Sequence, residues 1–281
     1  MINNIGKNLE EFRQKNPLTH CITNYVTVND CANAVLAIGG SPFMAEDPNE
    51  VCEVVTIADA LVINIGTLTK PQIESMKIAT KKANETNTPL ILDPVGVGVT
   101  EIRTKTTLDI INECDISVIR GNISEIKAIA NLTGVIEKSN TAKGVDVNID
   151  DVITKDNLKA NGEIIKQTAK ELNTTILATG PIDILSNGEK VIFIDNGDEI
   201  MSKITGSGCM LSAIVGSCVG GINPLEGSLL GVLSLDIAGE KARAKIDKNN
   251  EGTGSFRVYI IDYLYKMTGE QLVNEANIKI L

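Results

Sequence analysis

Tryptophan is absent from the 281-residue chain, and aromatic residues make up only 3% of it. The core therefore has to be built from aliphatic side chains. Hydrophobic residues account for 43% of the chain and charged residues for 22%, which is typical of a globular protein. No stretch has the composition of a linker, so we expect one domain over residues 1–281.

The six cysteines form no C-x-x-C pair. In a chain of this length, scattered cysteines favour reduced thiols in the cytoplasm over a disulfide framework or a zinc site. A cytoplasmic protein is accordingly expected, with most of these thiols acting as small core residues.

Long apolar runs are also missing. No run of about 18 apolar residues could span a membrane, and the polar first sixteen residues are not typical of a signal peptide. The net charge of −10 argues against nucleic acid or an anionic membrane as a partner. If the substrate carries phosphate, attraction has to be local, from a helix end, a metal ion or an arginine.

Short apolar runs alternate with helical patterns through the middle of the chain. The predicted strands are 61–66, 89–94, 116–121 and 174–180, and the predicted helices are 71–84, 104–113, 124–132 and most of 153–172. This alternation predicts an α/β fold with a mostly parallel sheet covered by helices on both faces.

The flanking segments predict further elements. Helices are expected over 4–15, 31–38, 48–58, 208–220, 225–246 and 255–267, a short extended piece over 41–44, and an antiparallel hairpin over 183–185 and 190–194 at the edge of the sheet. Asn29 or Asp30 could cap the second helix. The polar loop 135–150 is long enough to be mobile.

A glycine turn feeds the most apolar of these helices. Gly206 and Gly208 precede a run without a charged side chain until Glu226, so this helix is expected to be buried almost all round. A helix N-terminus carries unpaired N–H groups and a partial positive charge, and it binds anions readily. The alternative is a plain turn before a core helix, since a lone G-x-G is a weak signal.

Four predicted strands end in polar residues or glycine. Ligands of open parallel sheets bind beyond the carboxyl ends of the strands. The endings begin at Asn64, Asp93, Arg120 and Thr179, and together with the glycine turn they predict a cleft suited to phosphoryl transfer from a nucleotide.

Each candidate has a plainer alternative. Asp93 could cap a strand end, and Glu125 could be a helix N-terminal acid rather than a ligand of Mg²⁺ or its waters. Arg120 could simply pair with a carboxylate, and Thr179 could be a turn residue. For His20, the only histidine, we expect a structural hydrogen bond rather than catalysis.

Taken together, six segments resemble the hydroxyethylthiazole kinase family of the ribokinase-like superfamily. They occur in order over nearly the whole chain: PLTHCITNYV (17–26), GSPFMA (40–45), LVINIGTL (61–68), LDPVGVG (92–98), IRGNISEI (119–126) and TGSGCML (205–211). Cys21 and Ser207 are small departures from the residues usual in that family.

The resemblance implies ATP-dependent phosphorylation of the hydroxyl of 4-methyl-5-(2-hydroxyethyl)thiazole, with Mg²⁺, in a ribokinase-like homotrimer whose active sites lie near subunit interfaces. It implies that the thiazole is contacted by Met44, Gly206, Asn24, Val26 and Gly66, and that ATP is contacted by Arg120 and Thr179. It also implies that Asp93 and Glu125 bind Mg²⁺ or its waters. Cys209 would occupy the catalytic position.

The mechanism expected from these residues is a loose phosphoryl transfer. The amides of Gly206, Ser207, Gly208 and Cys209 would form an anion hole for the moving oxygens, and the helix N-terminus would lower the thiol pKa of Cys209 so that it accepts the hydroxyl proton. The alternatives are an ATP-dependent dehydratase that repairs hydrated nicotinamide nucleotides, a hydroxymethylpyrimidine kinase, and a non-catalytic nucleotide-binding module. Cys209 argues against the dehydratase, because that enzyme usually has aspartate at this position of the glycine-turn motif.

Overall fold

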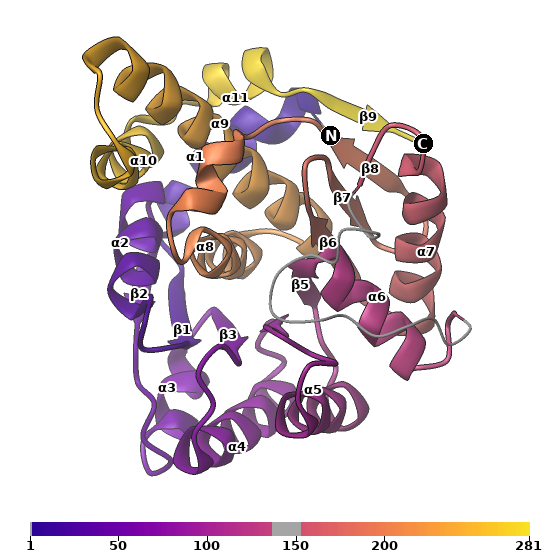
Figure 1. The fold of residues 1–281 in the computed structure, drawn as a ribbon. Coiled ribbons are helices and arrows are strands. Elements are labelled where there is room, and N and C mark those ends of the chain that lie inside the picture. The colour runs from indigo at the N-terminus through magenta and orange to yellow at the C-terminus, as the bar shows by residue number, and fades with distance from the viewer. Residues whose placement is uncertain (1, 137–152) are drawn as a thin grey trace.

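A nine-stranded sheet, which runs in the order β2-β1-β3-β4-β5-β6-β7-β8-β9, forms the centre of the computed structural model (Figure 1). The structure describes residues 2–136 and 153–281. The segment 135–150, for which we expected a mobile loop, lies almost entirely outside them. Among the described residues, no helix is long and apolar enough to cross a membrane.

The first six strands are parallel, as the alternation of elements predicted. Their bounds are β1 Leu18–Ile22, β2 Ser41–Phe43, β3 Ala60–Asn64, β4 Leu90–Asp93, β5 Val118–Asn122 and β6 Thr175–Thr179. All of β3 and β4 is buried, which explains why they read as continuous apolar runs.

The last three strands run antiparallel to their neighbours. They are β7 Asp183–Ser186, β8 Val191–Ile194 and β9 Ile278–Ile280. The predicted hairpin is confirmed as β7 and β8, but its place at the edge is wrong. The three-residue β9, near the C-terminus, pairs with the far side of β8 and is therefore the edge strand.

One face of the sheet is covered by five helices from the middle of the chain. They are α3 Val51–Ile57, α4 Lys70–Thr86, α5 Glu101–Glu113, α6 Ile123–Leu132 and α7 Leu158–Glu171. Alternate strand residues such as Leu61, Ile63 and Leu92 point into this layer and share one apolar cluster with Met76 and Ile126. In Figure 1, α3, α4 and α5 lie at the bottom of the view, and α6 and α7 lie at its right.

The opposite face carries the helices from both ends of the chain. They are α1 Ile2–Lys15, α2 Val28–Ile38, α8 Ser207–Gly221, α9 Pro224–Asn249, α10 Thr253–Lys266 and the short α11 Gly269–Glu275. Ile5, Leu9 and Phe12 of α1 are buried on one face, as their spacing predicted. The cap expected for α2 is wrong: Thr27 is its N-cap residue, and Asp30 lies in the first turn, where it pairs with Arg257.

Helix α8 is fixed between the sheet and α9. It is buried from Met210 to Gly220, as its lack of charge predicted. A Cβ on Gly216 would collide with Val62 of β3, and one on Gly231 of α9 would lie 2.9 Å from Val215 Cγ2. These two glycines let the sheet on one side and α9 on the other approach the helix closely.

Candidate active site

The carboxyl ends of four neighbouring strands and the N-terminus of α8 form the candidate site. Strands β3, β4, β5 and β6 are adjacent and parallel, so their ends meet at one edge of the sheet, as predicted. Asn64 lies opposite Asp93 in the register of β3 and β4, and Asn122 lies opposite Thr179 in that of β5 and β6. Helix α8 packs against β1, β3 and β4 and brings its first turn to the same edge.

The turn before α8 requires glycine. Gly206 is the N-cap residue, with a left-handed φ of 88°, and a Cβ there would lie 2.5 Å from Thr27 Cγ2. No side chain caps this end of the helix. The first hydrogen bond of the helix runs from Met210 N to Gly206 O at 2.8 Å. The N–H groups of Ser207, Gly208 and Cys209 belong to the first turn, which has no partner within the helix.

Asp93 is held as an acceptor in the middle of the site. Its side chain is buried, and Oδ2 accepts from Asn64 Nδ2 at 2.6 Å and from Ser212 Oγ at 2.7 Å. Arg120 Nη1 lies 3.7 Å from the same oxygen. Burial raises the pKa of Asp93, and the charge of Arg120 opposes that shift. Oδ1 is buried without a hydrogen-bond partner.

Arg120 reaches from β5 toward the glycine turn. Its Nη2 donates to Thr179 Oγ at 2.8 Å, so the two residues predicted to contact ATP lie together. A Cβ on Gly208 would lie 2.7 Å from Arg120 Nη1. The guanidinium therefore packs against the first turn of α8, and the second glycine makes room for it.

Glu125 has the structural role that was the alternative to metal binding. It forms a capping box with Asn122 at the start of α6: Glu125 Oε2 accepts from Asn122 N at 2.8 Å. Oε1 accepts from Gly96 N at 2.8 Å. Burial, followed by the nearby charge of Asp93, raises the pKa of Glu125 to about 7.

The expected lowering of the Cys209 pKa is wrong in direction. The pKa of the Cys209 thiol is raised, first because the group is buried and second because the carboxylate of Asp93 is near. Hydrogen bonding to Thr27 and Asn24 and the charge of Arg120 oppose the shift. The sequence revealed the helix N-terminus, but it could not reveal how far the surrounding strands desolvate the thiol.

The predicted thiazole contacts differ in their surroundings. Asn24 Nδ2 lies 3.1 Å from Cys209 Sγ, so this amide belongs to the same cluster as the thiol. Gly66 follows β3, and a Cβ there would lie 2.8 Å from Asn24 Nδ2. Val26 is exposed and Met44 is half-buried beside the core. The roles assigned to these residues stay predictions.

His20 has the structural role expected for it, and Arg103 has a structural role that the sequence did not predict. His20 is buried, and its Nε2 lies 2.9 Å from Ala45 O, which confirms the expected structural hydrogen bond. Arg103 was not among the candidates. Its guanidinium donates to Ile65 O at 2.7 Å, to Val95 O at 2.6 Å and to Gly66 O at 2.7 Å. It thereby ties together the loops that follow β3 and β4.

A cavity of 550 Å³ opens beside Arg120. It is lined by the predicted ATP contacts, Arg120 and Thr179, and by half of the predicted anion hole, Ser207 and Gly208. It is also lined by residues that the sequence did not single out, among them Asp183, Asp198, Met201, Leu211, Leu235 and Asp236. Apolar side chains beside charged and backbone donors suit a nucleotide, which has an apolar base and an anionic tail.

A buried carboxyl pair lies in the wall of this cavity. Asp183 Oδ1 accepts from Gly180 N at 2.8 Å. Asp236 is also buried, and its Oδ2 has no hydrogen-bond partner. Burial raises the pKa of Asp183 to about 6, and burial plus the charge of Asp183 raises that of Asp236 further.

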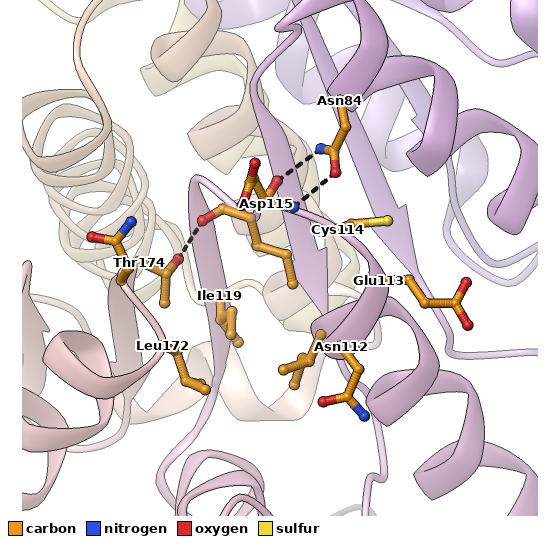
Figure 2. Close-up of a pocket in the computed structure, with 11 residues that line it drawn as sticks. Asn84, Asn112, Glu113, Cys114, Asp115, Ile119, Leu172 and Thr174 are labelled. Atoms are coloured by element: carbon orange, nitrogen blue, oxygen red, sulfur yellow. Dashed lines mark hydrogen bonds between the residues drawn. The ribbon is translucent and has the colours of Figure 1, made fainter.

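A second pocket, of 250 Å³, lies at the opposite end of the strands (Figure 2). Most of its lining residues lie just before β5 or β6, and several of their polar groups hydrogen-bond to one another. Asn84 Nδ2 donates to Asp115 O at 3.1 Å, Asp115 N donates to Asn84 Oδ1 at 2.8 Å, and Thr174 Oγ donates to Ile116 O at 2.7 Å. This pocket therefore has the character of a polar seam between elements.

The model of the hydroxyethylthiazole kinase family matches residues 9–270. The chain belongs to that family. It is 63% identical over 281 residues to a hydroxyethylthiazole kinase of Methanobrevibacter smithii, with 100% of this chain and 98% of the relative covered. It is 55% identical to hydroxyethylthiazole kinase 2 of Methanosphaera stadtmanae, with 97% of each chain covered.

Solved structures agree with this membership. The hydroxyethylthiazole kinase of Pyrococcus horikoshii superposes with a TM-score of 0.86 at 34% identity, over 99% of both chains. A ribokinase-like superfamily protein from Enterococcus faecalis has a TM-score of 0.62 at 14% identity, which shows the fold alone. The resemblance and the ribokinase-like fold are confirmed, the chain is a kinase, and the dehydratase alternative is not favoured.

Proposed function

We propose that this chain transfers the γ-phosphoryl group of ATP to the hydroxyl of 4-methyl-5-(2-hydroxyethyl)thiazole, a salvage step towards thiamine. The observation that carries the proposal is one cluster at the N-terminus of α8. Asp93, Arg120 and Cys209 gather there beside a 550 Å³ cavity of nucleotide character. Family membership supplies the substrate class.

The chemistry of a loose phosphoryl transfer matches what these groups offer. Charge on the transferring oxygens needs donors that are already in place. We assign that role to the N–H groups of Gly206, Ser207, Gly208 and Cys209. Arg120, held by Thr179, would bind the phosphates of ATP from the side of the cavity.

The donor set near Asp93 fits Mg²⁺ bound mainly through waters and phosphates. Oδ1 of Asp93 is buried and lacks a partner, whereas both oxygens of Glu125 already accept backbone N–H groups. Within residues 2–136 and 153–281, no group of three or more histidine, cysteine or acidic side chains could hold an ion. Mg²⁺ typically keeps several waters and takes few protein ligands, so Asp93 would contact it and Glu125 would orient a water. The ion would neutralise phosphate charge.

The acceptor alcohol is expected beside Cys209. Gly66, Gly206, Asn24, Val26 and Met44 would line its site. Because burial raises the thiol pKa of Cys209, we assign the thiol a minor part in accepting the hydroxyl proton. A dissociative transfer needs little base assistance, so the anion hole, Arg120 and the metal ion would carry most of the catalysis.

We further propose a homotrimer with active sites near the subunit interfaces. Large apolar side chains are exposed in the connection from β1 to α2, on α2 itself and at the end of β2. Tyr25, Val26, Leu36 and Phe43 are exposed by 75%, 52%, 56% and 38%. Such a patch favours a partner surface. Light scattering coupled to size exclusion tests this, since a mass near 30 kDa would refute it.

The reaction is tested by ³¹P NMR of the purified protein with MgATP and the thiazole alcohol. We expect a new phosphomonoester signal together with ADP, only when the thiazole is present. ADP without a phosphomonoester would indicate hydrolysis or a dehydratase-like use of ATP, and would refute the proposal. Chelation with EDTA should stop the reaction, and added Mg²⁺ should restore it.

A further inference from the structure

We infer that Asn64 is the positioning residue of this site, and that its amide holds the thiol of Cys209 and the carboxylate of Asp93 in one fixed arrangement. The inference rests on the proposed function for its catalytic part. Asn64 is the last residue of β3, is only 1% exposed, and lies opposite Asp93 in the sheet register. No role was predicted for it beyond ending a strand.

The amide of Asn64 uses all four of its hydrogen-bonding positions. Nδ2 donates to Asp93 Oδ2 at 2.6 Å and to Cys209 Sγ at 3.3 Å. Oδ1 accepts from Asn24 Nδ2 at 3.0 Å and from Gly66 N at 2.9 Å. An asparagine side chain offers two N–H donors and two acceptor lone pairs, so nothing is left over.

The orientation of this amide follows from its neighbours. Gly66 N can only donate, so the atom facing it has to be the oxygen. An ionised Asp93 can only accept, and its Oδ2 already faces Arg120, so the atom facing it has to be the nitrogen. Turning the amide over would break both contacts. Gly66 and Asp93 therefore fix the orientation of the N–H group that points at the sulfur of Cys209.

Cys209 Sγ consequently receives two amide donors. Asn64 Nδ2 is one, at 3.3 Å, and Asn24 Nδ2 is the other, at 3.1 Å. The orientation of Asn24 is fixed in turn, because its nitrogen faces Asn64 Oδ1 and its oxygen accepts from Thr27 Oγ at 3.1 Å. Two donors facing one sulfur occupy its lone pairs and favour the thiolate over the thiol.

Asn64 also determines which oxygen of Asp93 is left for other work. By occupying Oδ2 together with Ser212, the amide turns Oδ1 away from the network, and Oδ1 is the atom without a partner. One side chain thus sets the direction of the thiol and of the carboxylate. A small misplacement of reacting groups lowers rates by large factors, so Asn64 should affect kcat more than binding.

The test is Asn64→Asp, which keeps the shape and the acceptors but removes both donors and adds a negative charge. In the Cys52→Ser/Cys114→Ser background, the rate at which iodoacetamide alkylates Cys209 is followed against pH by mass spectrometry; the other three cysteines are buried. We expect the pKa of Cys209 to rise by about one unit or more. We also expect kcat to fall about 10- to 100-fold, while KM for ATP changes less than about twofold.

Asn84→Asp is the matched control. Asn84 also bridges backbone groups through its amide, but at the far end of the strands (Figure 2). It should leave the alkylation profile and kcat unchanged. Asn64→Ser removes the same bridge and adds no charge, so it replaces Asn64→Asp if that variant destabilises the fold, and its profile should move in the same direction.

An unchanged alkylation profile and an unchanged kcat in a folded Asn64 variant would overturn the inference. The alkylation measurement needs no turnover. If wild-type protein failed to phosphorylate the thiazole, the proposed function would fall while a shifted profile would still support the thiol-positioning role of Asn64.

Discussion

Replacing Asp183 by asparagine should weaken the dependence of stability on pH. The substitution keeps the Oδ1 acceptor for Gly180 N and lets the new amide donate to Asp236. It removes one ionisable group and the charge that raises the pKa of Asp236. The change is therefore almost isosteric and acts mainly on the proton balance of the buried pair.

The expected magnitude follows from the pKa of Asp183, which burial raises from 3.8 to about 6. A folded-state pKa above the unfolded value means that the stabilising contribution is complete below pH 3.8 and is lost as pH rises through about 6. At 1.36 kcal/mol per unit, that loss is about 3 kcal/mol, of which about half falls between pH 5 and 8. At pH 7 to 8, Asp183→Asn should recover the unfolding free energy that wild type loses when Asp183 ionises.

Urea unfolding followed by far-UV circular dichroism at pH 5, 6, 7 and 8 measures this, because the chain has no tryptophan for fluorescence. Relative to wild type, the variant should gain about 1–2 kcal/mol of unfolding free energy between pH 5 and 8. Asp195→Asn, at an exposed neighbouring position, is the control and should show a constant difference. A constant difference for Asp183→Asn as well would refute the reasoning.

The remaining predictions concern the site itself. Cys209→Asp should keep activity within about tenfold, whereas Asp93→Ala should lower kcat by about 10²-fold or more; steady-state kinetics with the opposite ranking would refute these roles. Gly208→Val should lower kcat at least about 10²-fold without unfolding the protein, since its side chain would displace Arg120 from the first turn of α8; a normal kcat with a normal melting temperature would contradict it. Arg103→Met leaves three backbone carbonyls without their donor, so it should lower the unfolding free energy by about 2–4 kcal/mol in urea titrations, and a change under about 0.5 kcal/mol would count against that.

The sequence predicted the parallel core of the sheet because its strands are local apolar runs. The sequence predicted poorly those strands that form only because a neighbouring strand is available for pairing. Strand β1 carries Thr19 and His20 among its five residues, so its composition alone left it undefined. Strand β9 has three residues and is extended because it pairs with the free side of β8. Neither signal is present in a local window.

For the candidate site, the strand-end rule correctly brought Asp93, Arg120 and Thr179 together. It could not indicate the direction in which a side chain points. Asn64 looked like an ordinary strand ending, although its amide contacts Asp93 and Cys209. The pKa of Cys209 was predicted in the wrong direction for a related reason, since desolvation depends on every element packed around the thiol.

The close packing of α8 has a consequence for engineering. Gly216 fits against Val62, and Gly231 fits against Val215, so the helix has no space in which to slide or tilt. A library aimed at new alcohols would gain little from Gly216 or Gly231, where an added side chain would collide with packed neighbours. Diversity is better directed to Val26 and Met44, two of the proposed thiazole contacts, which are not fully buried. Acceptor choice could then change while the transfer chemistry stays as it is.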